Sequence, residues 1–423
     1  MIFFSLLLIS KTHEDFTGYH IQSINDIFYN KLTFGIANFN INLAHTSLLS
    51  YVQALYFLPL FNSKLIHIPV FLIFFSTLGY FYVVLKNQNI KKNETFFSCF
   101  IIFVLIAKFG RLSEYGYDYI AQFIILIVFH KLFFKNEFVE EFYKAIALFA
   151  FAVCIKIISF FAFPLVILGL SKKLFKSVSY KFIFLILIIG SFLTFNSFVR
   201  TGCIFYPINV TCLEKNVVSW SVKKEIKRHS SVVELWAKGF MAQDNLAKSY
   251  IAESDKYLSN FNWVGNWISV HFFYKVYEYL LILIFIYFLL LFFLKEKIIF
   301  LNFNKKNIIT ILISGLATFS WFNIAPQFRF GFASITVLTF FILRIFISSS
   351  INIQKKSFSY LLIILLIFFN VRNVFRINKE IHRTDLYQYK NFPWINENIL
   401  EKKFSYKNRE VLDKKFFKII QNK

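Results

Sequence analysis

Residues 276–294 read VYEYLLILIFIYFLLLFFL, and Glu278 is the one charged residue among them. A helix of about 20 apolar residues is long enough to cross a lipid bilayer. Comparable stretches occupy 65–85, 182–199 and 332–347. Hydrophobic residues make up 57% of the chain and the mean hydropathy is +0.58, which is more than one soluble core of this length could bury. The bilayer is therefore the expected solvent.

Helices are the expected way of crossing it, because unpaired backbone groups cannot face lipid and the alternating pattern of a membrane barrel is missing. We predict an all-α fold, a polytopic transmembrane bundle of about 10–12 helices whose outer loops carry short helices. The predicted spans lie near 46–61, 65–85, 95–107, 119–134, 142–170, 180–199, 271–294, 308–322, 331–348 and 358–370.

Two of these spans, and the apolar segment that precedes them, depart from a simple crossing. The stretch 46–61 is better placed as a re-entrant or interfacial helix, since a full crossing there breaks the alternation that follows. Lys156 and Pro164 divide 142–170 into two short helices that enter and leave the membrane. Residues 2–9 lack the charged start and cleavage site of a signal peptide. We interpret them as the outer half of a first helix, with truncation by a late start codon as one explanation.

Lysines in the short loops give the orientation. The loops near residues 86–92, 131–135, 172–176, 295–306 and 355–356 are basic and share one face, which the positive-inside rule makes cytoplasmic. The first outer loop at 11–45 and a large outer loop at 200–270 then lie on the opposite face. We assign 1–370 to a transmembrane domain and 371–423 to a polar, basic tail. The order of the crossings puts this tail on the outer side. We accept this despite its positive charge, because long segments follow the positive-inside rule poorly.

Composition also excludes several classes of function. The formal charge of +24 is spread over loops between apolar spans, so it reflects topology, and we expect no nucleic-acid partner. The four cysteines form no CxxC pair, and we predict no metal centre built from them. Cys203 and Cys212 share a polar loop, where they are either a disulfide or two free thiols. Walker, GxGxxG, HExxH and GxSxG motifs are all absent.

The first outer segment, 11–20, reads KTHEDFTGYH and places Glu14 and Asp15 directly after the first apolar stretch. Charges at that depth usually serve a function. A carboxylate there can deprotonate an acceptor hydroxyl or hold a divalent cation against a phosphate. We therefore predict Asp15 and Glu14 as catalytic residues, with His20 as a substrate contact. The alternative is that the two acids only cap the helix that follows.

The second outer loop, 108–119, reads KFGRLSEYGYDY. Its polar residues Arg111, Glu114 and Asp118 are predicted substrate contacts. Asp118 opens the next span, where it serves either as a helix cap or as the second acidic residue of a site shared with Asp15.

Three cations are expected on the same side as these acids. Lys156 interrupts an apolar stretch, Arg200 ends the span at 182–199, and Arg329 follows the turn at Pro326. An arginine fork suits the oxygens of a phosphate or pyrophosphate. Lys156 and Arg200 can instead extend to the lipid head groups as long cationic side chains do.

This layout resembles the GT-C class of polytopic membrane glycosyltransferases, which includes bacterial lipid A aminoarabinose transferases and protein O-mannosyltransferases. The resemblance rests on the acidic loop at Glu14 and Asp15, the second loop ending at Asp118, and the larger outer loop after a mid-chain helix. Four short segments, 15–20, 35–47, 201–207 and 325–330, also resemble a set of largely uncharacterised bacterial membrane proteins with this architecture. The similarity extends to about residue 347.

The resemblance implies a function. In GT-C enzymes an acidic residue of the first outer loop acts as a base or near a metal, and the donor is a sugar on polyprenyl phosphate. Asp15 then takes this role, with membrane lipids around it. No cofactor is assigned, and a divalent cation is the one candidate. We expect an inner-membrane enzyme that glycosylates an envelope glycan, lipid or protein at the periplasmic face. A transporter or flippase for lipid-linked glycans, or a non-enzymatic assembly subunit, is the alternative.

Overall fold

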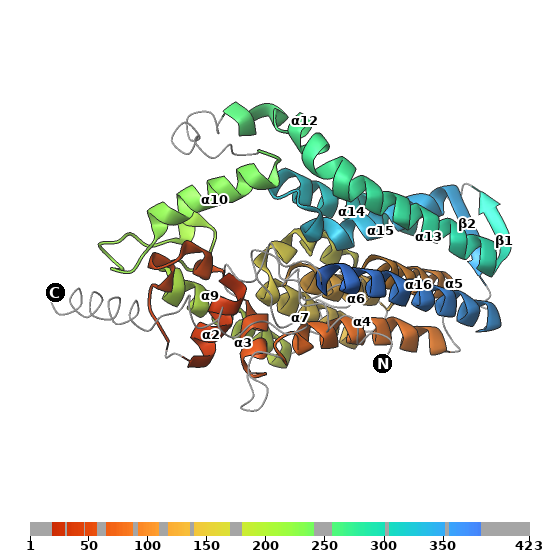
Figure 1. The fold of residues 1–423 in the computed structure, drawn as a ribbon, viewed down its shortest axis with the longest axis horizontal. Helices are drawn as coiled ribbons and strands as arrows, with labels where there is room; N and C mark the ends of the chain where they lie inside the picture. Colours follow the sequence, from red (N-terminus) through yellow and green to blue (C-terminus); the bar gives the residue numbers. More distant parts are fainter. Residues whose placement is uncertain are drawn as a thin grey trace.

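The structure, a computed structural model, is an elongated bundle of helices (Figure 1). Most of the long helices run beside one another along its longest axis. A small β-ribbon lies at one end, and the short helices of the first and the large outer loops gather at the other. The structure describes residues 19–29, 32–45, 47–56, 65–87, 92–109, 117–135, 139–169, 180–240, 256–300, 304–351 and 355–381.

The first half of the chain forms short helices and then the first part of the bundle. In order these are α2 (Ile21–Tyr29), η3 (Ile36–Asn38), η4 (Ile41–Ala44), α3 (Leu48–Ala54), α4 (Ile68–Lys86), α5 (Lys92–Lys108), α6 (Asp118–Phe134), α7 (Val139–Ile155), η6 (Ile157–Gly169) and α9 (Tyr180–Thr201).

The second half begins with the large outer loop and completes the bundle. Its elements are η7 (Asn209–Thr211), α10 (Lys223–Ala237), η8 (Ser259–Phe261), α12 (Val264–Trp267), η9 (Ile268–Tyr277), α13 (Glu278–Leu294), β1 (Lys295–Phe300), α14 (Lys305–Ile324), α15 (Phe328–Phe346), β2 (Ile347–Ile351) and α16 (Lys355–Ile381).

Helix α6 is the centre of the bundle. It packs against α4, α7, η6 and α15, and nearly all its side chains are buried. A helix that is apolar on every side is buried either among other helices or in lipid. Helix α6, which reads DYIAQFIILIVFHKLFF, is enclosed by other helices. Much of the surrounding packing is aromatic, as where the rings of Phe97 and Phe340 meet edge to face at 5.1 Å between centroids.

An outer ring of helices presents apolar side chains to the surroundings. Six segments among the described residues are long and apolar enough to cross a membrane: 68–86, 184–201, 264–293, 305–324, 328–346 and 358–375. Their exposed side chains include Phe285 on α13 and Ile364 on α16. This confirms a multi-pass helical membrane protein. The 17-residue helices α5 and α6 lie in the interior of the same bundle, whereas α7, which has the same length, is only partly buried.

One of the two irregular segments breaks where the sequence predicts, and the membrane position of the other stays a prediction. The predicted break in 142–170 occurs at Lys156, where α7 ends and the 3₁₀ helix η6 begins. In the region 46–61 the described part is the seven-residue helix α3, which is much shorter than a crossing.

The predicted all-helical fold class is confirmed, and among the described residues one short β-ribbon is added to it. β1 and β2 pair antiparallel, with Phe300 opposite Ile347. They continue from the ends of α13 and α15, which are neighbours in the bundle. Pairing satisfies the backbone N–H and C=O groups of both segments where the helices stop. A pattern of apolar residues does not reveal that two helix ends are adjacent.

Charged residues at the ribbon end of the bundle tie several helices together. Lys135 Nζ lies 2.8 Å from Glu94 Oε1, and His130 Nε2 lies 3.2 Å from the same oxygen. Lys306 Nζ donates to the carbonyl oxygen of Phe133 at 2.7 Å. Two of the basic loops predicted to share one face therefore meet at this end, through Lys135 and Lys306. The loop at 172–176 lies outside the described residues. The polar residues described next lie at the other end of the bundle.

Candidate functional site

An ion triad joins three helices at the end of the bundle away from the β-ribbon. Lys156 Nζ lies 3.0 Å from Asp118 Oδ1, and Arg329 Nε lies 3.0 Å from Asp118 Oδ2. The Asp118 side chain is only 6% exposed. Each carboxylate oxygen therefore has its own cation, and charge-assisted contacts of this kind fix the positions of all three side chains.

The ends of the helices place these residues. Asp118 opens α6, where a negative charge is favourable against the helix dipole. Lys156 lies at the break between α7 and η6, and its N–H still donates to Ala152 O at 2.9 Å. Arg329 is the second residue of α15, directly after the turn that contains Pro326.

A small, partly open pocket lies beside the triad. Lys156 belongs to both, because its side chain forms part of the pocket wall. The other lining residues are Tyr19, His20, Ser23, His45, Ser47, Ser50, Tyr117, Ile155, Ile157 and Tyr206. Eight of these eleven residues carry a hydroxyl or an imidazole group, and such groups can bind a polar ligand with several hydroxyl groups.

Hydrogen bonds hold the polar wall in place. Ser50 Oγ and Tyr117 OH are 2.7 Å apart, and Tyr206 OH lies 3.5 Å from His45 Nε2. Burial, with a smaller effect of Tyr19, raises the pKa of the Tyr206 hydroxyl. This hydroxyl is therefore protonated at neutral pH and can donate to the His45 ring.

His20 connects the pocket to the triad. Its ring packs edge to face against Tyr117 at 4.3 Å between centroids and lies 4.2 Å from the Tyr19 ring. It is buried and close enough to interact electrostatically with Asp118. His20, a predicted substrate contact, thus lines the pocket. It follows the predicted catalytic residue Asp15 by five positions in the sequence.

Arg200 lies behind the pocket wall. Its Nη1 donates to Ser23 Oγ and to the carbonyl oxygen of Leu43, both at 3.1 Å. The side chain is buried and so links α9 to α2 and to η4. The two hydrogen bonds account for its burial. Its predicted role in substrate binding stays a prediction.

The loop after α9 positions Tyr206. Cys203 and Cys212 form a disulfide, which decides between the two states expected from sequence. Ser197 Oγ donates to Cys203 O at 2.7 Å and accepts from the Tyr206 N–H at the same distance. The loop is therefore fastened to α9 at its beginning, and Tyr206 faces the pocket.

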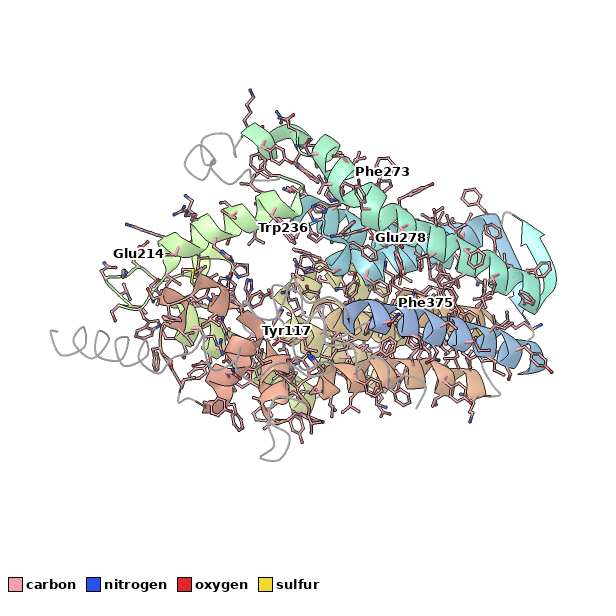
Figure 2. All side chains as sticks on the ribbon, in the orientation of Figure 1. Tyr117, Glu214, Trp236, Phe273, Glu278 and Phe375 are labelled. Carbon is pink, nitrogen blue, oxygen red and sulfur yellow. A yellow bond between two sulfur atoms is a disulfide. The ribbon has the colours of Figure 1, made fainter. Side chains whose placement is uncertain are left out.

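Helix α10 approaches the same wall from the large outer loop. The His229 ring lies 6.0 Å from the ring of His45, edge to face. Its Nε2 is buried without a hydrogen-bond partner among the described residues. Burial lowers the pKa of His229, so the ring is neutral at pH 7. Figure 2 shows Tyr117 and Trp236, the latter near the end of α10, at this end of the bundle.

The described residues contain no group of three or more His, Cys, Asp or Glu side chains that could hold a metal ion. The carboxylates predicted to approach a divalent cation, Glu14 and Asp15, lie outside the described residues. Such a cation stays a prediction for this part of the chain.

Four of the predicted residues meet in space: His20, Asp118, Lys156 and Arg329. Glu14, Asp15, Arg111 and Glu114 lie outside the described residues. Sequence reasoning did not select His45, Ser50, Tyr117 or Tyr206 as site residues. Two of them, His45 and Tyr206, belong to the short segments that carried the family resemblance. Membership in these segments was the feature of the sequence that could have identified them as site residues.

The fold and site define a helical membrane protein with a hydroxyl- and imidazole-lined pocket and an ion triad at one end of its bundle. The chain belongs to the family described as domain of unknown function DUF8201, whose model matches residues 1–336. That region includes the triad and every residue that lines the pocket. No curated protein and no solved structure matches the chain.

Proposed function

We propose that this protein is a GT-C-type glycosyltransferase of the inner membrane. It moves a sugar from a polyprenyl-phosphate carrier to an envelope glycan, lipid or protein at the periplasmic face. The observation that carries the proposal is the Asp118, Lys156 and Arg329 triad beside a hydroxyl-lined pocket. The absence of nucleotide-binding motifs fits a lipid-linked donor.

The reaction is a displacement at the anomeric carbon of the sugar. An acceptor hydroxyl attacks this carbon, the bond from the carbon to the phosphate oxygen breaks, and the electron pair leaves on the carrier phosphate. Asp15, with Glu14 beside it, takes the hydroxyl proton. Lys156 and Arg329, with Arg200 behind the pocket wall, stabilise the charge that develops on the phosphate.

Asp118 is a positioning residue in this scheme, because both its oxygens are already bound to cations. An ammonium group has three N–H donors, so Lys156 can bind Asp118 and a phosphate oxygen together. The pocket wall formed by Tyr19, His45 and Tyr206 is suited to the sugar, since hydroxyl, imidazole and ring faces all bind carbohydrate hydroxyls and C–H groups.

Two features support the periplasmic assignment. The disulfide between Cys203 and Cys212 lies next to the pocket, and disulfides persist in oxidising compartments. The opposite end of the bundle carries the basic loops, which the positive-inside rule places in the cytoplasm.

The test uses membranes that contain the full chain and lipid-linked sugars extracted from wild-type cells. Replacing the general base, Asp15→Asn, should lower sugar transfer by about 10²-fold or more. Glu214→Gln, on an exposed ion pair with Lys223, is the matched control and should transfer at the wild-type rate. Undiminished transfer by Asp15→Asn removes the assigned base. Sugar that crosses the membrane with no new glycosidic bond favours the transporter instead.

A further inference from the structure

Helix α10 of the large outer loop reaches from the pocket to the ion triad. It contacts η4 and η7, and its Ile226 belongs to the buried cluster that includes Tyr206 of the pocket. At the other end of α10, Gln327 Nε2 donates to the carbonyl oxygen of Ala237 at 3.4 Å. Gln327 precedes Arg329 by two residues. Figure 1 shows α10 extending from the short helices of the first outer loop toward the ends of α14 and α15.

Three residues of α10 form what we call the α10 stripe: His229, Val233 and Trp236. They are separated by four and by three residues, which places them on one side of a helix. The His229 ring lies 6.0 Å from the ring of His45, which lines the pocket. At the other end of the stripe, Arg329 Cζ lies 5.6 Å from the centre of the Trp236 ring. The stripe therefore begins beside the pocket and ends at the triad.

The α10 stripe carries binding groups that the described residues leave unused. Trp236 is 43% exposed and Val233 is 40% exposed. Within the described part of the chain, no group accepts a hydrogen bond from the Trp236 indole N–H. His229 Nε2 is buried and likewise has no hydrogen-bond partner there, which is an uncommon state for a buried ring nitrogen. The stripe thus offers an aromatic face, a donor and an imidazole nitrogen to a ligand.

The remaining surface of α10 indicates that this ligand comes from water. Lys224, Lys227 and Arg228 are exposed on other sides of the helix, and α10 is not among the described segments that are apolar enough to cross a membrane. Seven residues separate His229 from Trp236, or about 10 Å along the helix axis. A water-soluble ligand that contacts both is therefore longer than one sugar ring.

We propose that the α10 stripe binds an oligosaccharide acceptor whose terminal sugar reaches the pocket beside His45. The Trp236 indole packs against the C–H face of one sugar ring and donates to a hydroxyl, and His229 binds a hydroxyl of a ring nearer the pocket. This inference rests on the proposed function. It narrows the acceptor from an envelope glycan, lipid or protein to a glycan.

The first test is calorimetric titration of the purified full chain in detergent with oligosaccharides released from the envelope of wild-type cells by mild acid. We expect Trp236→Ala to weaken their binding about tenfold, because the stacking contact is lost. Trp236→Phe keeps an aromatic face and should restore most of the affinity. Lys227→Ala is the control, since Lys227 is exposed and residues two apart do not share a helix face. It should bind as the wild type does. Thermal unfolding shows that each variant is folded.

The second test separates acceptor binding from support of Arg329. Sugar transfer is measured in membranes that contain the full chain, with lipid-linked sugars from wild-type cells and increasing amounts of the same oligosaccharides. We expect Trp236→Ala to raise KM for the oligosaccharide about tenfold, with kcat and KM for the lipid-linked sugar unchanged. A lower kcat, or a higher KM for the lipid-linked sugar alone, would mean that Trp236 only positions Arg329, and this overturns the proposal.

The two tests distinguish failure of this inference from failure of the proposed function. Equal oligosaccharide affinity of the wild type and Trp236→Ala overturns the acceptor site, as does a wild type that binds no oligosaccharide. Transfer that depends on Asp15 would still stand in both cases. Oligosaccharide binding that depends on Trp236, in a chain that transfers no sugar, keeps the α10 stripe as a glycan-binding surface and overturns the transferase.

Discussion

At the scale of single residues, Asp118 is the centre of the candidate site. Its sequence position allowed two roles, a helix cap or an acid shared with Asp15. The structure adds a third, because its two oxygens bind Lys156 and Arg329 separately. The side chain therefore links α6 to the start of η6 and to α15. A carboxylate held between two cations is poorly placed to accept a proton.

We predict that Asp118→Asn destabilises the protein. The change leaves Lys156 and Arg329 facing an uncharged group in a largely buried position, and breaking a buried ion pair from one side costs about 3 kcal/mol or more. Thermal unfolding in detergent micelles measures the loss. The double variant Asp118→Asn/Lys156→Gln should recover part of it, because one unpaired cation is removed.

The control for this prediction is Glu214→Gln. Glu214 pairs with Lys223 at 2.6 Å, but its side chain is 63% exposed. Removing an exposed pair should change the free energy of unfolding by less than about 1 kcal/mol. If Asp118→Asn unfolds at the wild-type temperature, the triad does not hold the three helices together.

At the scale of secondary-structure elements, the contact between α14 and α15 sets the position of Arg329. Gly331 faces Trp321 so closely that an added Cβ would lie 2.5 Å from the indole ring. The ring itself is fixed, since Trp321 is buried and its Nε1 donates to Gln327 O at 2.8 Å. Small residues at helix contacts allow such close approach in membranes.

We predict that Gly331→Ala pushes α14 and α15 apart. Overpacking of this kind costs about 1–3 kcal/mol, which exceeds the gain of up to about 1 kcal/mol from the better helix former. Gly315→Ala on α14 is the matched control, because an added Cβ there meets nothing within 4 Å. We expect a lower unfolding temperature for Gly331→Ala than for Gly315→Ala. Equal unfolding temperatures of the two variants would contradict the close contact between Gly331 and Trp321.

Sequence could predict most elements of this fold but few of its contacts. The apolar stretches located the membrane helices, and Lys156 with Pro164 located the break between α7 and η6. The β-ribbon was missed because it depends on α13 and α15 ending side by side. Likewise, Lys156 and Arg329 could be selected as cations beside apolar stretches, and His20 as part of the polar first outer segment. Ser50 and Tyr117 were not selected and become site residues only through packing.

At the scale of the whole molecule, alternating helix direction places the described site residues at one end. The starts of α6 and α15 and the end of α7 converge there, whereas Lys135 and Lys306 lie at the other end. Successive membrane helices run in opposite directions, so the order of the spans in the sequence was sufficient to assign these residues to one end of the bundle. It could not specify which of them touch, because that depends on how the helices are arranged around α6.

This two-ended arrangement makes the side of the membrane directly testable by cysteine labelling. Lys224 on α10 and Lys305 at the start of α14 are both exposed, and they mark the two ends. The native background is low, since Cys99 and Cys154 are buried and Cys203 is paired with Cys212. We expect a membrane-impermeant maleimide to label Lys224→Cys in intact spheroplasts, but Lys305→Cys only after permeabilisation.

The unmodified chain, treated in the same way, is the control for residual thiols. The reverse labelling pattern would place the pocket and the disulfide in the cytoplasm, where thiols are kept reduced, and a periplasmic transferase would then have no accessible site. Labelling of both positions from one side would contradict helices that cross the membrane in succession. The expected pattern instead places the triad where a carrier phosphate and a water-soluble acceptor can both reach it.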